Sequence, residues 1–482
     1  MRSQSTRKSL FITTLVFVLL LPAFPVTGQE TVSKQQLTGT WLGRIQSGVL
    51  YLRLVFNISL TASDTLKASL ESPDQGTVII PLGAVKLNGD TIIIEAGLIG
   101  GKYTGVIKGE KSIEGTWEQL NQSFTLNLEK QETEFRLNRP QEPEPPFPYR
   151  SEEVSFWNEK AGITLAGTLT MPEGDGPFPA AILISGSGPQ NRDEEIMGHK
   201  PFAVIADHLT RNGIAVLRFD DRGTGKSQGK YATATSADLA TDAEAALIYI
   251  LRHPSVDKTG AGFIGHSEGG LIAPIVASAR KDVAWIVSLA GPGVTGEQLL
   301  LRQGADISRA MGNSEKDIQT ASKINRKIYS IIMKTPESMA AEPKLIKTMN
   351  KELRKIDVAQ EIINERINSL KISLLGDSYN WFRFFMLTEP GDYWSVVKCP
   401  VLILNGQMDL QVEAVSNTGG IAAALMKGGN SSYEVKVFPG LNHLFQNCTT
   451  GLPGEYGTIE ETFSPEALAV ISNWIRKTSM GM

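Results

Sequence analysis

From Ser151 onward the sequence alternates short apolar runs with amphipathic segments, and this alternation restricts the fold more than any other feature. The apolar runs include "PAAILISG", "IAVLRFD", "AGFIGH" and "VAWIVSLAG", and helical patterns occupy 201–212, 236–253 and 269–280. Strands that are separated by helices pair in parallel and are covered on both faces. We therefore expect the α/β class, with a mostly parallel sheet flanked by helices over residues 151–293 and 396–482.

The alternation stops after Gly293 for about a hundred residues of helix-like sequence, and it resumes with the strand pattern "CPVLILNG". An insertion between two core strands, on the side where loops carry chemistry, is most simply a lid. We therefore predict a helical lid or cap over residues 294–395.

The part of the chain before Ser151 has a different pattern. Residues 29–130 alternate apolar and polar positions between turn pairs such as Asn88-Gly89, which predicts a small antiparallel β barrel or sandwich. The tripeptide Gly-Thr-Trp occurs at 39–41 and again at 115–117, and we expect both tryptophans to be buried. The proline-rich "PQEPEPPFP" marks residues 131–150 as an extended linker.

Residues 1–28 have the layout of a signal peptide. Three basic residues precede an apolar run from Leu10 to about Val26, which two prolines interrupt. We expect cleavage between Gly28 and Gln29, because a spanning helix needs about 20 uninterrupted apolar residues. The expected product is periplasmic or secreted, with no stable membrane anchor.

Composition excludes some partners. The net charge is -4, and removal of the basic leader makes it more negative, which argues against nucleic acid and anionic membrane surfaces as partners. Cys399 and Cys448 are the only cysteines and allow one disulfide at most. They lie on opposite sides of the expected strand and loop, so we predict two free thiols. Nothing in the sequence indicates the oligomeric state.

The stretch "GFIGHSEGGLIAP" contains a Gly-x-Ser-x-Gly pentad, which can occur by chance in a chain with 46 glycines. Here Ser267 lies between an expected strand and an expected helix, as in a nucleophile elbow. The sharp turn needs small residues two positions before and after the serine, and Gly265 and Gly269 meet that need. Ser267 is therefore a candidate nucleophile.

A serine nucleophile needs a base and an acid, and strand ends supply both. Of the five histidines, His443 follows the last expected strand, in "FPGLNHLFQ". Asp409 follows the preceding strand, "VLILNGQ", and can orient the imidazole. The order Ser267, Asp409, His443 is the order that this kind of fold uses. Such a triad requires neither a metal ion nor an organic cofactor.

An oxyanion hole needs two backbone N–H groups. Glu268 supplies the first, and "SGSGPQ" offers Ser187 for the second, with Gly188 as a close competitor. In "RFDDRGTGKS" the glycine spacing does not fit a phosphate loop, so Asp221 and Arg222 are expected to brace the oxyanion loop instead. His199 follows the first core strand in a loop and is a candidate pocket residue.

The acyl pocket is expected beneath an aromatic segment of the lid. Residues 379–394 read "YNWFRFFMLTEPGDYW" and contain seven aromatic residues. The spacing of Trp381, Phe384 and Phe385 also suits a lid face packed on the core. If Phe384 and Phe385 instead form an apolar wall over Ser267, they favour short to medium acyl chains.

Together "SGSGPQNRDE", "RFDDRGTGKS", "GHSEGG", "LNGQMDLQV" and "PGLNHLFQ" resemble the α/β-hydrolases over residues 151–478, and in particular the exported bacterial carboxylesterases of the esterase D type. Serine hydrolases of the prolyl oligopeptidase kind are similar at a greater distance. The resemblance implies an α/β-hydrolase fold and assigns nucleophile, acid and base to Ser267, Asp409 and His443. Where many members have His-Gly before the oxyanion loop, this chain has Ser185-Gly186, which leaves the second donor open.

Three functions follow in order of preference. The first is a serine carboxylesterase that acts on small-molecule esters through an acyl-enzyme. The second is an exported peptidase or amidase that uses the same triad. The third is a binding protein in which the β domain captures a carbohydrate or lipid and the hydrolase part is inert.

Overall fold

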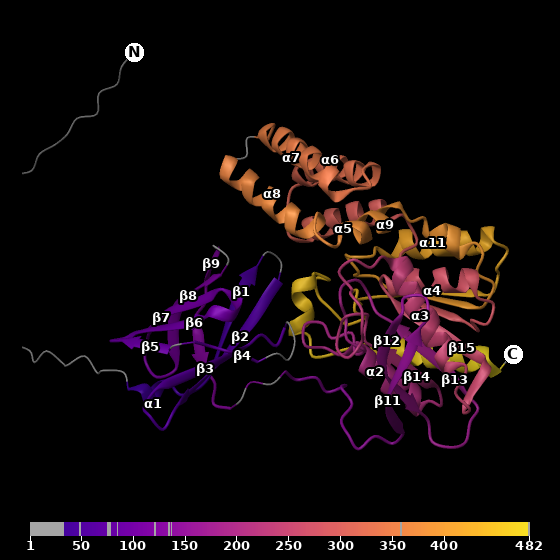
Figure 1. The fold of residues 1–482 in the computed structure, drawn as a ribbon, viewed down its shortest axis with the longest axis horizontal. Coiled ribbons are helices and arrows are strands. Elements are labelled where there is room, and N and C mark those ends of the chain that lie inside the picture. Colours follow the sequence, from indigo (N-terminus) through magenta and orange to yellow (C-terminus); the bar gives the residue numbers. More distant parts are fainter. Residues whose placement is uncertain are drawn as a thin grey trace, which may run out of the picture.

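The structure, a computed structural model, describes residues 33–480 except 48–49, 75–78, 84, 120–121, 134, 136 and 357–358. The expected signal peptide, residues 1–28, lies outside the described residues. Two sheets organise the chain, and the segment joining them is irregular (Figure 1). In the described part of the chain no helix is both long and apolar enough to cross a membrane.

The first sheet is antiparallel and has the order β4-β3-β2-β1-β10-β8-β7-β6-β5, with β9 paired to β8. We call residues 33–130, which contain it, the β domain. Its strands are β1 (Gly39–Ser47), β2 (Leu50–Leu60), β3 (Leu66–Glu71), β4 (Ile80–Pro81), β5 (Val85–Asn88), β6 (Thr91–Ala96), β7 (Gly101–Ile107), β8 (Ser112–Gln119), β9 (Gln122–Thr125) and β10 (Leu128–Lys130). Two short helices, α1 (Lys34–Leu37) and η1 (Gly97–Ile99), complete it.

The two ends of this sheet approach each other, because β5 contacts β3. The sheet therefore curls around an apolar interior, in agreement with an all-β domain. Both tryptophans of the repeated Gly-Thr-Trp, Trp41 and Trp117, are buried in that interior. They lie on β1 and β8, the two strands that flank β10, so the repeat serves the packing of the core.

The second sheet has eight strands in the order β11-β12-β14-β13-β15-β16-β17-β18. The pairs β11·β12 and β12·β14 are antiparallel, and the others are parallel. Its strands are β11 (Arg150–Asn158), β12 (Ile163–Met171), β13 (Phe178–Ile184), β14 (Ala215–Phe219), β15 (Val256–His266), β16 (Ile286–Leu289), β17 (Val401–Gly406) and β18 (Tyr433–Phe438). We call this unit the α/β domain.

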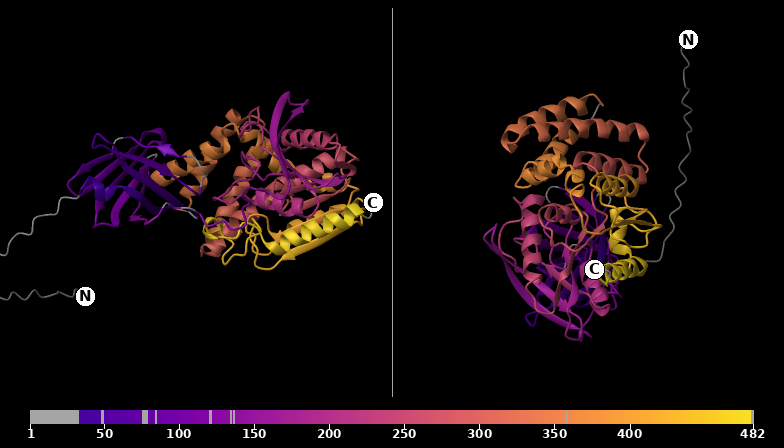
Figure 2. Two further views of the ribbon diagram at one scale, coloured as in Figure 1. Left: turned by 90° about the horizontal axis from the view of Figure 1, so that it is seen from below. Right: turned by 90° about the vertical axis from the view of Figure 1, so that its right-hand side faces the viewer.

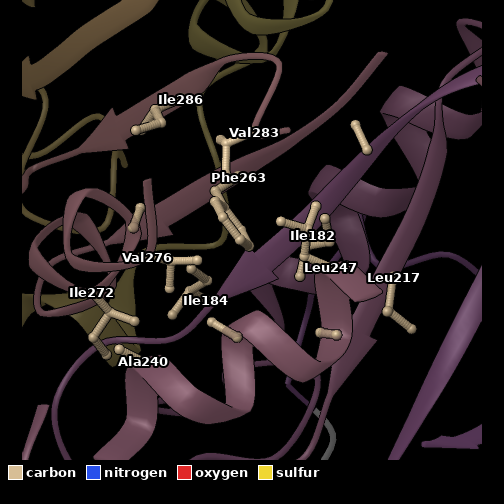
Figure 3. Close-up of a cluster of buried hydrophobic side chains, with 14 of the residues drawn as sticks. Ile182, Ile184, Leu217, Ala240, Leu247, Phe263, Ile272, Val276, Val283 and Ile286 are labelled. Carbon is tan, nitrogen blue, oxygen red and sulfur yellow. The ribbon is translucent and has the colours of Figure 1, made fainter. Parts of the chain in front are cut away.

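Helices cover both faces of this sheet: α2 (Pro201–Arg211), α3 (Ser236–Ile250), α4 (Gly269–Ala279), α11 (Ala414–Lys427) and α12 (Pro465–Met480). Alternate residues of β13 point to opposite faces, so Ile182 and Ile184 pack with α3 and α4, as Figure 3 shows. Ala181 and Leu183 pack with α2 and α12 on the other face. Burial on both faces explains why the central strands are apolar throughout.

Between β16 and β17 the described residues form six helices, which we call the helical insertion: α5 (Gly296–Ala310), α6 (Glu315–Lys334), α7 (Ser338–Arg354), α8 (Gln360–Leu374), α9 (Tyr379–Leu387) and α10 (Pro390–Trp394). These helices, orange in Figures 1 and 2, lie along one side of the α/β domain. Helices α6 to α9 share an apolar core of their own. A short helix near the end of the chain, η2 (Pro453–Thr458), contacts β2 of the β domain.

Candidate active site

Ser267 occupies the turn between β15 and α4, at the C-terminal edge of the parallel sheet. Its φ is 51°, a left-handed value that is unusual for serine. Its N–H donates to the Leu289 carbonyl at 2.8 Å, which ties the turn to the neighbouring strand β16. Strained backbone that the surrounding structure enforces is typical of functional sites.

The glycines around Ser267 are required by close packing, as the sequence predicts. A Cβ on Gly265 would lie 2.1 Å from the Gly269 carbonyl oxygen. A Cβ on Gly269 would lie 2.1 Å from the Ile184 carbonyl oxygen, on strand β13. Both distances are far below van der Waals contact, so neither position can hold a side chain without moving the backbone.

The predicted acid and base meet at the same edge of the sheet. Asp409 follows β17 and His443 follows β18, and the two side chains are joined from Asp409 Oδ2 to His443 Nδ1 at 2.8 Å. The other oxygen of Asp409 accepts the backbone N–H groups of Gln411 and Val412, each at 2.8 Å. Asp409 is therefore fixed on both oxygens, and the Nε2 of His443 is the nitrogen left for a proton from a nucleophile.

A second histidine, His266, links the serine turn to His443. The Nε2 of His266 donates to the His443 carbonyl at 3.0 Å, and the two rings lie 4.8 Å apart. The Nδ1 of His266 is 2.9 Å from Glu194 Oε1, which also accepts the Gly186 N–H at 2.6 Å. Burial opposes a charge on His266, but the Glu194 carboxylate and the His443 carbonyl outweigh it and raise the pKa of His266.

These contacts connect the serine turn, the His443 loop and the loop after β13 around one buried carboxylate. No motif in the sequence identifies Glu194, because an acidic residue in a polar loop is ordinarily solvated. The position of His266 directly before Ser267 was the only available signal for this arrangement.

The loop after β13 lies against the serine turn and contains both candidates for the second oxyanion donor, Ser187 and Gly188. Gly186 packs against the serine, since a Cβ there would lie 3.2 Å from Ser267 Cβ. The N–H of Gly188 donates to the Tyr231 hydroxyl at 2.9 Å and is thereby occupied. Within the described residues the N–H groups of Ser187 and Glu268 have no hydrogen-bond partner. The geometry therefore favours Ser187 over Gly188.

Asp221 braces this loop as predicted. It accepts the Ser185 hydroxyl at 3.0 Å and the Gln190 N–H at 2.9 Å. Arg222 does not, and that prediction was wrong: its guanidinium binds Asp242 at 2.7 Å on α3 and so fixes the helix beside the loop. Arg222 begins the turn that follows β14, and its side chain points toward α3.

The side chain of Glu268 is buried beside the nucleophile. Its Oε1 accepts the Ser236 hydroxyl at 2.5 Å and the indole N–H of Trp381 at 2.7 Å. Its Oε2 is buried and, within the described residues, has no partner. Burial raises the pKa of Glu268 above its ordinary value. Trp381 belongs to α9, so this contact joins the helical insertion to the serine turn.

The two candidate pocket phenylalanines lie on different faces of α9. Phe385 is buried with Leu271 of α4 and Val412 of the Asp409 loop, and its ring stacks on Trp381 at 5.5 Å. Phe384 is half-buried and lines a surface pocket with Thr235. Of the two, only Phe385 contacts residues beside the triad.

His199 is not placed to contact a substrate. It is fully buried, its Nδ1 is 2.9 Å from the Thr462 hydroxyl and its Nε2 is 2.9 Å from the Tyr456 carbonyl. Burial lowers the pKa of His199 to about 4, so the ring is neutral near pH 7. With both nitrogens engaged, the burial argues against the prediction that His199 lines the substrate pocket.

The two cysteines are free, as predicted: Cys399 and Cys448 form no disulfide. Burial raises the pKa of the Cys399 thiol to about 12 and that of the Cys448 thiol to about 11, so neither is an activated nucleophile. Among the described residues, no group of three or more His, Cys, Asp or Glu side chains could hold a metal ion.

Comparisons with known proteins agree with the resemblance seen in the sequence. Residues 199–375, which include Ser267, match the family model described as serine aminopeptidase, S33. Esterase EstD of Thermotoga maritima is 31% identical over 168 residues, which are 34% of this chain and 39% of that protein. The human acyl-coenzyme A thioesterase 1 is 25% identical over 257 residues, 52% of this chain and 51% of that protein.

The chain thus spans about half, or less, of the length of these curated relatives. Among solved structures, an esterase of Pyrococcus furiosus, Pf2001, is similar with 17% identity and a TM-score of 0.43. That similarity covers 71% of this chain and 97% of the esterase.

Proposed function

We propose that this α/β-hydrolase is an exported serine hydrolase that cleaves carboxylic esters through Ser267, His443 and Asp409. The observation that carries the proposal is the buried contact of His443 Nδ1 with Asp409 Oδ2, at the sheet edge where Ser267 sits at positive φ. The similarity to an esterase and to thioesterases supports acyl transfer to a hydroxyl nucleophile.

Each triad residue and each backbone donor has one role in the proposed ester hydrolysis. His443 Nε2 takes the Ser267 hydroxyl proton while Oγ attacks the ester carbonyl, and Asp409 stabilises the resulting imidazolium. The N–H groups of Glu268 and Ser187 donate to the oxyanion of the tetrahedral intermediate. His443 then protonates the departing alcohol, and the acyl group remains on Ser267. Water, deprotonated by His443, attacks the acyl-enzyme and releases the acid.

The test is Ser267→Ala in the full chain, with p-nitrophenyl butyrate as substrate. We expect hydrolysis to fall by at least about 10³-fold, since removing a triad nucleophile leaves only the oxyanion and binding contributions. The matched control is Ser278→Ala, which changes a half-buried serine on the same helix, α4, and should leave the rate unchanged. Equal rates for the wild type and Ser267→Ala would end the proposal.

For the acyl group we propose short to medium chains. The apolar cluster of Leu271, Leu299, Phe385 and Val412, with Trp381 at its border, lies between the serine turn, the Asp409 loop and α9. Apolar walls that exclude water favour uncharged acyl chains. A series from acetate to laurate should show the highest kcat/KM between four and eight carbons, roughly the length that one such cluster covers.

A second candidate is an amidase or peptidase, which the family model described as serine aminopeptidase favours. The same triad would serve, because amide and ester hydrolysis share the acyl-enzyme. A panel of aminoacyl-p-nitroanilides, p-nitrophenyl esters and acyl thioesters discriminates between these leaving groups. Rapid anilide turnover with negligible ester turnover would reverse the ranking.

Export is part of the proposal and rests on the leader-like residues 1–28. We expect the mature protein to begin at Gln29 and to occur in the periplasm or the medium. Sequencing the N-terminus of the protein purified from the native host tests this, and an intact leader on the cell-associated protein would contradict it.

A further inference from the structure

The β domain contacts the α/β domain through η2, a segment that also contacts the loop of the candidate catalytic acid. In Figure 1 this segment is the yellow helical turn between β2 and the α/β domain. Its residues accept hydrogen bonds from both domains.

On the side of the β domain, Arg53 of β2 is held by Asp74. The Asp74 carboxylate accepts both the backbone N–H of Arg53, at 2.6 Å, and its guanidinium Nε, at 3.0 Å. The ion pair is nearly excluded from water, with 1% of the Asp74 side chain exposed. Arg53 is thereby oriented so that its Nη2 donates to the Gly457 carbonyl at 2.7 Å.

Arg139 of the linker reaches the same carbonyl. Its Nη2 donates to Gly457 O and its Nη1 to Ile459 O, each at 2.9 Å, while its Nε donates to Gly198 O at 2.9 Å. Burial and the neighbouring Arg53 lower the pKa of Arg139 to about 10, which leaves it charged at neutral pH. Two charged donors on one carbonyl make a strong, directional contact.

Gly457 is packed too closely against Asp74 and Arg53 to hold a side chain. A Cβ at this position would lie 2.8 Å from Asp74 Oδ1 and 3.3 Å from Arg53 Nη2. The neighbouring Tyr456 is fully buried, and the neutral His199 ring holds its carbonyl. Arg53 and Arg139 on one side and His199 on the other therefore fix the backbone of η2. We call these contacts the clamp.

From η2 the contacts continue to the acid. The Tyr456 hydroxyl accepts the side-chain amide of Gln411 at 3.1 Å, and the Gln411 backbone N–H donates to Asp409 Oδ1 at 2.8 Å. Gly451 also packs closely against Met408, since a Cβ on Gly451 would lie 2.2 Å from the Met408 carbonyl oxygen. The segment before η2 is thus packed directly against the residue that precedes Asp409.

We propose that the β domain positions the Asp409 loop, with Arg53 as the positioning residue, so that this domain is a structural part of the catalytic site. This inference rests on the proposed function for its activity readout. Arg53 touches neither Asp409 nor His443, and it acts through Gly457, Tyr456 and Gln411. Loss of the clamp releases η2, and the backbone donors to Asp409 Oδ1 then lose their fixed geometry.

The experiment compares Arg53→Ala with Arg44→Ala in the full chain, using p-nitrophenyl acetate. Arg44 is exposed and lies directly opposite Arg53 in the pairing of β1 with β2, which makes it a matched control. Because misplaced catalytic groups reduce turnover more than binding, we expect kcat to fall about tenfold in Arg53→Ala, with KM changed less than about twofold. Arg44→Ala should match the wild type.

Hydrogen exchange provides a readout that does not depend on activity. In Arg53→Ala we expect faster exchange at residues 451–459 and also at 409–412. Faster exchange confined to 451–459, or a fall in kcat without faster exchange at 409–412, would overturn the proposal. If the wild type hydrolyses no ester, the proposed function fails, and exchange at 409–412 still decides this inference.

Two further variants distinguish positioning from loss of folding. In Arg53→Lys the side chain can contact Asp74 or the Gly457 carbonyl, but it lacks the planar guanidinium group that binds both at once. We therefore expect a kcat between those of the wild type and Arg53→Ala. Asp74→Asn keeps an acceptor for the Arg53 backbone N–H and should fold, with a smaller loss of kcat in the same direction. Wild-type kcat in both variants would overturn the proposal even if Arg53→Ala does not fold.

Discussion

The C-terminal edge of the sheet and the helical insertion differ in how their polar groups are held. At the sheet edge, Asp409, Glu194 and Asp221 are buried, and each accepts at least two hydrogen bonds from fixed groups. In the insertion, several acidic groups form ion pairs with exposed partners instead, such as Glu315 with Arg309. Buried, satisfied carboxylates preorganise a site, whereas exposed pairs contribute little.

The two regions meet at the serine turn and at the Asp409 loop. The insertion has its own apolar core, and it contacts the serine turn through the Trp381–Glu268 hydrogen bond and the small cluster around Phe385. From this difference we expect turnover to depend on the sheet edge and acyl selectivity to depend on the insertion. The following changes test that division.

The largest expected effect is that of Asp409→Asn at the sheet edge. An uncharged amide cannot stabilise the imidazolium form of His443, so we expect kcat for p-nitrophenyl butyrate to fall about 10³- to 10⁴-fold. Asp392→Asn, at an exposed acid of the insertion, should change kcat less than about twofold. Similar losses in both variants would break the comparison.

The next largest effect is expected when a glycine is replaced by alanine, once at the sheet edge and once in the insertion. Gly265→Ala forces a Cβ against backbone in the serine turn and should lower the free energy of unfolding by about 3 kcal/mol or more. In Gly304→Ala, in α5, the new Cβ meets nothing within 4 Å, so the free energy of unfolding should rise by up to about 1 kcal/mol. Urea unfolding measures both, and a stable Gly265→Ala variant would show that the turn can relax.

The aromatic pair on α9 tests the junction itself. Phe385→Ala removes a buried ring that packs on α4. We expect the free energy of unfolding to fall by about 3 kcal/mol and the ratio of butyrate to acetate hydrolysis to change. Phe384→Ala, on the outer face of α9, should lower the free energy of unfolding by about 1 kcal/mol at most and leave the ratio of butyrate to acetate hydrolysis unchanged. A changed ratio in Phe384→Ala alone would move the acyl pocket to the outer face of α9.

The smallest effect concerns the titration of Glu268. Its folded-state pKa is raised, so the folded protein binds more protons than the unfolded chain above pH 4.5, and ionisation lowers stability as the pH rises. Glu268→Gln should therefore be more stable than the wild type by about 1 kcal/mol at pH 7, with a smaller gain near pH 4.5. Urea unfolding between pH 4 and pH 8 measures it.

Glu389→Gln, at an exposed acid of the insertion, is the control for that titration. Its free energy of unfolding should match that of the wild type to within about 0.5 kcal/mol. A gain for Glu268→Gln that is the same at all pH values would mean that the amide packs better and that the charge is not involved.

Part of this site could be read from the sequence because it depends on local rules. Two glycines at fixed distance from a serine, between strand and helix patterns, indicate a sharp turn whatever surrounds it. Residues directly after parallel strands share one edge of the sheet, so Asp409 and His443 could be placed near each other before their contact was seen. Opposite placement of Cys399 and Cys448 followed from the same reasoning.

Other residues were misjudged because their roles depend on what packs against them. His199 looks like an exposed loop residue until Tyr456 and Thr462, more than 250 positions later, close over it. Phe384 and Phe385 are neighbours in the sequence, and only the docking of α9 decides which ring turns inward. Arg222 binds Asp242 of α3, a partner 20 positions later that no pattern in the sequence indicates.

The sequence by itself determined the alternation of strands and helices, the serine turn and the order of the candidate triad, because periodicity and turn geometry are properties of short segments. Tertiary structure alone decided the Glu194–His266 link and the clamp of the β domain on η2. Each of these joins residues distant in the chain through buried charges or carbonyls. Such groups find partners only when the whole fold excludes water around them.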